Sequence, residues 1–167
     1  MISTDIRSFI RVAPIFMMLF TAKAANTSDN AADLFQDAKQ TAAQLKRDVG
    51  EMETYARSGV TWRAHSDQIN IIRAHVNKAG QLAAQLEKSR STAAPWHQTA
   101  IDRLTPLLRE LAGNIETMIE HINKQGDVRN PEYTKYLKAN EDLANELSNL
   151  ISDTVDYDKT KSEMQKP

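Results

Sequence analysis

Apolar side chains recur every three or four residues in four successive segments of similar length, and no other feature of the chain constrains its fold as strongly. This spacing places each set of side chains on one face of an α-helix. The segments span approximately residues 30–58, 61–89, 95–125 and 130–158. Gly and Pro each occur only 5 times, too rarely for a β-rich fold that needs a turn at every strand end. The pattern therefore predicts an all-α protein.

Helix-ending and helix-starting residues lie where the apolar pattern is interrupted. Gly59 and Gly126 follow the first and third segments, in the position that a helix C-terminus favours. Thr61 is a suitable cap for the second segment. The sequence Asn130-Pro131-Glu132 combines a cap, a proline at the first helical position and an acidic first turn. These signals predict four separate helices joined by short loops.

Four helices of nearly equal length with short loops must run antiparallel to their neighbours, which predicts an up-down-up-down four-helix bundle. At 1.5 Å per residue each helix is about 40 Å long. Pro106 lies inside the third helix, where it predicts a kink rather than a break, because the apolar stripe continues unshifted on both sides. The remaining faces are polar, which favours a monomer or a weak homodimer.

The N-terminal residues have the organisation of an export signal. Basic residues precede a short apolar run, Val12–Ala22, and an A-x-A motif at residues 22–24. We interpret residues 1–24 as a signal peptide, with the mature chain starting at Ala25. The apolar run is about 11 residues long, against about 20 for a helix that spans a bilayer. We therefore expect a periplasmic or secreted protein with no stable membrane anchor after cleavage.

Charge and cysteine content restrict what the mature chain binds. The formal net charge is −1, and residues 1–24 carry three basic residues and one acidic residue, so their removal leaves −3. This balance excludes the basic surface that nucleic-acid binding needs. The chain has no Cys, so disulfides cannot stabilise it. Its stability must therefore come from packing of the core. We predict one bundle domain over residues 25–158, followed by a polar, frayed tail over residues 159–167.

Two methionines and two histidines are the candidate site residues. Folding the chain at its loops places Met52, His65, Met118 and His121 at the same end of the bundle, together with tyrosines and a tryptophan. Such a set could hold a haem iron, copper or zinc. The alternative is that methionine fills the core and histidine caps it beside the aromatic rings. We favour the capping interpretation, with no cofactor, and keep the metal site as the alternative.

The chain resembles the periplasmic four-helix b-type cytochromes in its export signal, bundle architecture and lack of Cys. Those proteins bind haem through a Met in the first helix and a His in the last. Here the fourth segment contains no His, and the only later methionine, Met164, lies in the tail. The ligand pattern of that family therefore does not transfer, and a c-type haem attachment would need Cys.

No set of residues has the spacing of a catalytic motif. Phosphate-binding loops, G-x-S-x-G and H-E-x-x-H are absent, and no Glu-x-x-His pair suits a di-iron bundle. His75 and His97 lie at the edges of apolar stripes, so we do not interpret them as ligands. A secreted helical chorismate mutase would need inward arginines, but Arg73, Arg103 and Arg109 lie beside the stripes. The sequence thus predicts no catalytic residue.

The segments Thr61–Gly80, Ala94–Ala112 and Asn130–Tyr157 resemble uncharacterised exported bacterial helical-bundle proteins. The resemblance implies export and a bundle fold, and it implies no activity. We therefore predict an exported, non-enzymatic bundle that acts by binding or structural interaction in the cell envelope or outside the cell. Its expected partner is an envelope protein or a small ligand.

Overall fold

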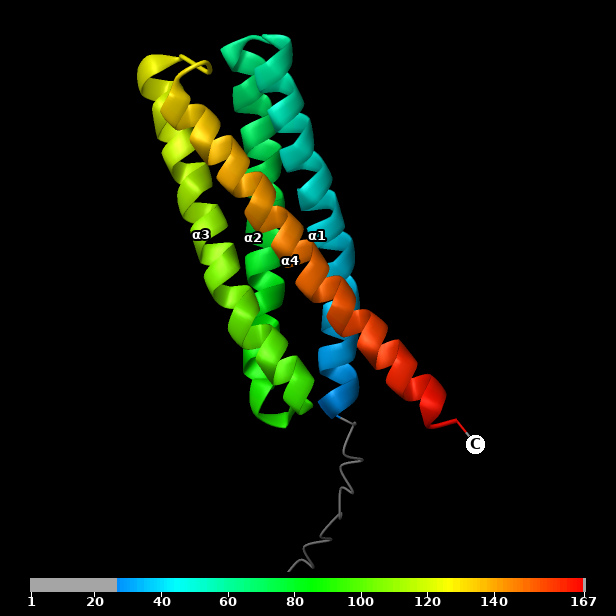
Figure 1. Cartoon of the computed structure of the whole chain (residues 1–167). Helices are drawn as coiled ribbons and strands as arrows, with labels where there is room; N and C mark the ends of the chain where they lie inside the picture. The colour runs from blue at the N-terminus through cyan, green and yellow to red at the C-terminus, as the bar shows by residue number, and fades with distance from the viewer. Residues whose placement is uncertain (1–26, 167) are drawn as a thin grey trace, which may run out of the picture.

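The computed structural model describes residues 27–166, and within them it is an all-α bundle of four long helices and one 3₁₀ turn (Figure 1). The predicted signal peptide, residues 1–24, lies outside the described residues. The elements are α1 (Thr27–Ser58), α2 (Trp62–Ser89), η1 (Arg90–Thr92), α3 (Pro95–Gln125) and α4 (Pro131–Met164).

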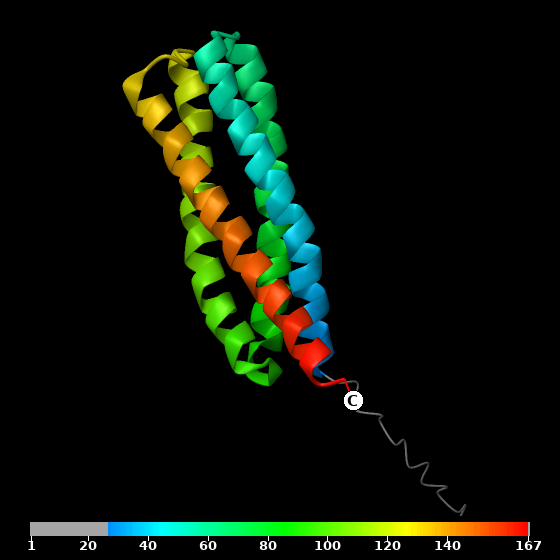
Figure 2. The same cartoon turned by 45° about the vertical axis from the view of Figure 1, so that its right-hand side comes forward.

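Each helix packs against the helices before and after it in the chain, and α4 packs back against α1 to close the bundle. Figures 1 and 2 show that neighbouring helices run in opposite directions, with α4 crossing the bundle at an angle to α1. This arrangement confirms the predicted antiparallel four-helix bundle. No helix within residues 27–166 combines the length and the apolar character needed to cross a bilayer.

The predicted ends of the helices are confirmed at most positions. Gly59 and Gly126 have positive φ angles of 69° and 62°, which a glycine adopts without the steric cost of a Cβ atom. The Asn130 Oδ1 atom accepts a 2.8 Å hydrogen bond from the Glu132 amide, as expected of an N-cap. Thr61 occupies the N-cap position of α2, but its side chain makes no capping hydrogen bond. The first helix begins three residues earlier than the predicted Asn30.

Helix α3 continues without a break through Pro106. Proline cannot donate the backbone hydrogen bond to the carbonyl of Asp102, and its ring crowds that carbonyl. The neighbouring core residues Leu104 and Leu108 are nevertheless both buried. Packing of the apolar face therefore keeps the helix unbroken across the proline, as predicted, and the kink at Pro106 stays a prediction.

The core runs the length of the bundle and consists of the apolar stripes of all four helices. In α2 and α3 the apolar residues that recur every three or four positions are all buried: Ile69, Ile72, Val76, Ala79, Leu82, Leu86, Ile101, Leu104, Leu108, Leu111, Ile115, Met118 and Ile122. The largest fully buried side chains include Phe35 near the start of α1 and Tyr133 near the start of α4. These two aromatic rings lie toward opposite ends of the bundle, where they pack against the histidines described below.

The predicted frayed tail is wrong for residues 159–164, because α4 continues to Met164. These residues include no Gly or Pro to end the helix. In addition, the side chains of Asp158 and Lys161 contact α3 and hold the last turns against the bundle. The segment is polar and mainly exposed, as predicted, but it is part of the folded domain.

Candidate functional site

One end of the bundle, where the α1–α2 and α3–α4 connections lie, brings together aromatic and histidine side chains from all four helices. We call it the closed end and define it by Tyr55, His65, His121 and Tyr133. Ring centroids are 6.2 Å apart for Tyr55 and His65, 5.7 Å for His65 and Tyr133, and 5.5 Å for His121 and Tyr133. The prediction that these residues share one end is confirmed.

His65 is fully buried at the closed end and forms a hydrogen bond across the bundle. Its Nδ1 atom lies 3.0 Å from the hydroxyl of Tyr133, whereas its Nε2 atom is buried without a hydrogen bond. Burial lowers the pKa of His65, and the backbone of Tyr55 offsets only part of this effect. Burial also raises the pKa of Tyr133 well above its usual value. The pair is therefore neutral at physiological pH.

Met118 and His121, on α3, are likewise engaged by neighbouring groups. The Asn140 side-chain amide donates to the Met118 sulfur at 3.1 Å, and both side chains are buried. The His121 Nε2 atom lies 2.8 Å from the backbone carbonyl of Asp127 in the α3–α4 connection. A metal ion at either residue would have to displace these contacts.

The four candidate ligands therefore serve packing and hydrogen bonding at the closed end. Met52 lies in the hydrophobic core, and the other three hold the contacts just described. Within residues 27–166 no group of three or more His, Asp or Glu side chains converges in a way that could hold a metal ion. This geometry favours the capping interpretation over a haem or metal site.

The opposite end carries a different constellation, which the sequence did not predict. We call it the open end and define it by Trp96, His97, Asp158 and Lys161, where α1 and α3 begin and α4 ends. The Trp96 Nε1 atom donates to one carboxylate oxygen of Asp158 at 2.7 Å, and the His97 Nε2 atom lies 2.7 Å from the other. Asp158 thus joins the last turns of α4 to the first turn of α3.

The expectation that His97 lies at the edge of the apolar stripe is wrong. His97 is only 2% exposed, and its ring stacks on Phe35 with centroids 5.1 Å apart. Its Nδ1 atom is buried and has no hydrogen-bond partner among the described residues. A histidine is buried here because the carboxylate of Asp158 pairs with its other nitrogen, which offsets part of the desolvation cost.

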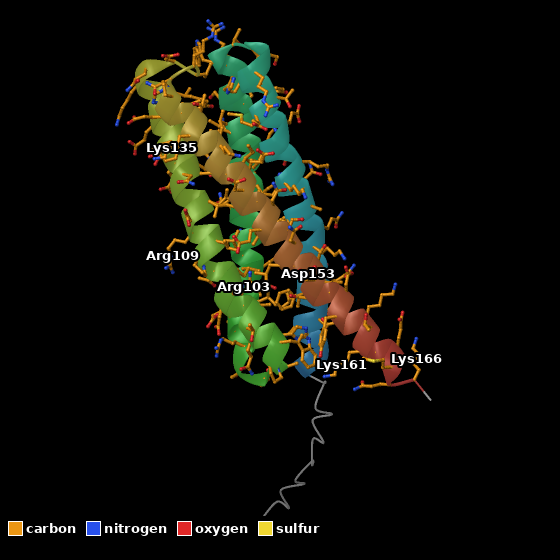
Figure 3. The ribbon with its side chains drawn as sticks, in the orientation of Figure 1. Arg103, Arg109, Lys135, Asp153, Lys161 and Lys166 are labelled. Atoms are coloured by element: carbon orange, nitrogen blue, oxygen red, sulfur yellow. The ribbon has the colours of Figure 1, made fainter. Side chains whose placement is uncertain are left out.

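An open cleft of about 670 Å³ lies at the open end, between the first turns of α1 and α3 and the last turns of α4. Trp96 forms one wall, and the Lys161 ammonium lies 3.6 Å from the centroid of its ring. Tyr157 contacts the same indole edge-on, with centroids 5.2 Å apart. Figure 3 shows Lys161 at this end of the bundle, with Lys166 farther out, beyond the end of α4. Asp33 of α1 also lines the cleft.

A third polar cluster lies at mid-height between α1 and α2. The carboxylate of Asp48 accepts a hydrogen bond from Gln44 at 2.8 Å and lies 2.6 Å from His75 Nδ1. The backbone carbonyl of Asp48 accepts a 3.0 Å hydrogen bond from the buried Gln68 side chain. His75 is partly exposed at the edge of its stripe, as predicted, but its pairing with Asp48 was not. The cluster connects α1 to α2, and none of its residues lines the cleft at the open end.

The three arginines considered for a dianion site are exposed and do not converge, which confirms their predicted position beside the stripes. Arg103 pairs with Glu146 of α4 at 3.4 Å. Arg109 lines an apolar surface groove between α2 and α3, and Figure 3 shows its side chain pointing away from the bundle. Arg73 lines a smaller hollow nearer the closed end.

The sequence did not predict the open end, because Asp158 is 61 residues from His97 and lies at the predicted end of the bundle, directly before the segment expected to be a frayed tail. The one available signal was the adjacent pair Trp96-His97 in the first turn of a helix that starts with proline. The chain matches no protein-family model, no curated protein and no solved structure.

Proposed function

We propose that this chain is an exported, non-enzymatic four-helix bundle that binds a small ligand in the cleft of the open end, in the periplasm or outside the cell. The single observation that carries the proposal is the open cleft walled by Trp96, whose indole is fixed by a hydrogen bond to Asp158. The basic and apolar pattern of residues 1–24 supports the export part of the proposal.

The open end has the features of a recognition site that is formed before its ligand arrives. Trp96 contacts His97, Tyr157 and Lys161, so its orientation is determined by the fold rather than by a ligand. A fixed aromatic wall lowers the entropy cost of binding, and a few polar groups around it supply specificity. At the closed end the aromatic rings pack on one another, so they do not form a comparable wall for a ligand.

The non-enzymatic part of the proposal rests on the surroundings of His97. A histidine that acts as a base for a nucleophile must reach it by a hydrogen bond. The Nε2 atom faces Asp158, and the Nδ1 atom has no hydrogen-bond partner in the described part of the chain. This environment supports a role for His97 in positioning Asp158 and Trp96.

The test is native mass spectrometry of the full chain, expressed in its host and purified gently from the compartment that receives it. We expect a start at Ala25 and a bound small molecule that is lost in Trp96→Ala. The matched control is Trp62→Ala, which removes the other tryptophan, 47% exposed and at the opposite end. Ligand-free protein, or a ligand retained in Trp96→Ala, would contradict the binding site.

A further inference from the structure

We infer that the cleft of the open end takes an organic cation, whose ammonium group replaces that of Lys161 on the face of Trp96. This inference rests on the proposed binding function and names the chemical class of the ligand. According to this inference, Lys161 is a residue of the chain itself that competes with the ligand for the face of Trp96.

The first argument is the geometry of Trp96. A cation within about 6 Å of an indole centroid is attracted by the negative face of the ring. The Lys161 ammonium lies 3.6 Å from that centroid, so the face already holds a cation. Asp158 fixes the indole by its Nε1 atom, and Tyr157 contacts it edge-on. A second ammonium group would meet a surface that is already oriented for it.

The second argument is the charge that remains when Lys161 leaves the ring. Two carboxylates, those of Asp33 and Asp158, line the cleft, together with Lys159 and Lys161. Asp33 forms no ion pair with another described residue. If the flexible Lys161 side chain turns into solvent, two acidic groups face one remaining lysine. The cleft is then net negative and favours a cation over an anion.

The third argument concerns the position of Lys161 in the chain. It lies in the last turns of α4, four residues after Tyr157, and its long side chain turns into solvent without moving the helix backbone. An internal occupant lowers the apparent affinity of a competing ligand by the fraction of time that it fills the site. Removal of the Lys161 ammonium should therefore tighten the binding of a cation.

The experiment follows the fluorescence of Trp96 in a Trp62→Phe variant of the full chain, because the chain has 2 Trp and this leaves only one. The probe is choline chloride, titrated at constant ionic strength against sodium chloride. Its neutral isostere, 3,3-dimethyl-1-butanol, is titrated in parallel. We expect a saturable change with choline, with a dissociation constant on the order of millimolar, and none with the alcohol.

Variants of charged residues then assign the site. We expect Lys161→Met to tighten choline binding by about two- to fivefold, and Asp33→Asn to weaken it by a similar factor. The control is Lys166→Met, two residues beyond the end of α4, because Lys166 is exposed and does not line the cleft. This control should leave choline binding unchanged.

Two results would overturn the cation assignment. One is the absence of a saturable choline signal in both the Lys161 and Lys161→Met chains. The other is a saturable signal with sodium sulfate that Lys161→Met abolishes, which would make the cleft an anion site. A neutral or anionic ligand found by mass spectrometry and lost in Trp96→Ala would refute the cation alone, and the proposed binding function would stand.

Discussion

Both ends of the bundle contain the same kind of polar pair, but the chemical partner of the histidine differs. At each end a buried histidine pairs with a side chain from α4, Tyr133 for His65 and Asp158 for His97. At the closed end the partner is a neutral phenol, and the rings around it pack together. At the open end the partner is a carboxylate that also fixes Trp96 beside a cleft. The identity of the α4 residue thus separates an end that seals the core from an end that presents a surface.

The largest effect is expected from Asp158→Ala, which removes the acceptor for both Trp96 and His97. The buried His97 nitrogen then has no partner, and the last turns of α4 lose their attachment to α3. We expect a loss of about 2–3 kcal/mol in the free energy of unfolding, measured by urea denaturation. Asp156→Ala is the control, because Asp156 makes only an exposed ion pair with Lys39. Equal losses of unfolding free energy in the two variants would show that the pairing of Asp158 with Trp96 and His97 adds no stability.

The corresponding change at the closed end is Tyr133→Phe, which keeps the ring and removes only the hydroxyl. His65 Nδ1 then loses its hydrogen bond inside the core. We expect a loss of about 1–2 kcal/mol in the free energy of unfolding, measured in the same way. Tyr136→Phe is the matched control, since Tyr136 is only partly buried. An unchanged stability of Tyr133→Phe would mean that the hydroxyl does not hold His65.

The closed end should also make stability depend on pH. Burial lowers the pKa of His65 below its ordinary value of 6.5, so the unfolded chain binds a proton more readily than the folded chain. The contribution of neutral His65 to the free energy of unfolding is therefore fully present above pH 6.5. It decreases as the pH drops toward the pKa of His65 in the folded state. We expect His65 to account for part of the stability that the protein loses between pH 7.5 and 5.5.

This contribution is measured by thermal unfolding at both pH values in the parent chain and in His65→Gln. The variant should lose less stability on acidification than the parent. His121→Gln serves as the control, because His121 lies at the same end but is only partly buried. The groups that face His65 are Tyr55 and Tyr133, which do not titrate in this range. Parallel pH profiles for the parent and His65→Gln would refute the assignment.

The smallest effect is expected from added metal or haem. The candidate ligands His65, Met118 and His121 already hold contacts within the protein. We therefore expect no Soret band after haem addition and no stoichiometric uptake of zinc or copper by the purified chain. Absorption spectra and metal analysis check this. Stoichiometric binding that is lost in His65→Ala would reverse our interpretation of the closed end.

The closed end could be predicted in outline because its residues flank the helix ends. Two helices joined by a short loop bring the last turn of one beside the first turn of the next, so His65 and Tyr133 follow from loop positions alone. The open end differs because Asp158 lies beyond the last strongly apolar turn of α4. The absence of Gly and Pro permits those polar turns to remain helical but does not require it, since their order also depends on contacts with Trp96 and His97.

The sequence by itself determined the all-α class, four helices, most of their ends and the side of each helix that is buried. These properties depend on local spacing and on caps such as Asn130 and Gly126, which act within a few residues. Only the tertiary structure decided that Asp158 pairs with His97 and Trp96, that α4 continues to Met164, and that a cleft opens there. The reason is that polar pairing between distant segments depends on distance and burial in the packed bundle, which no local pattern encodes.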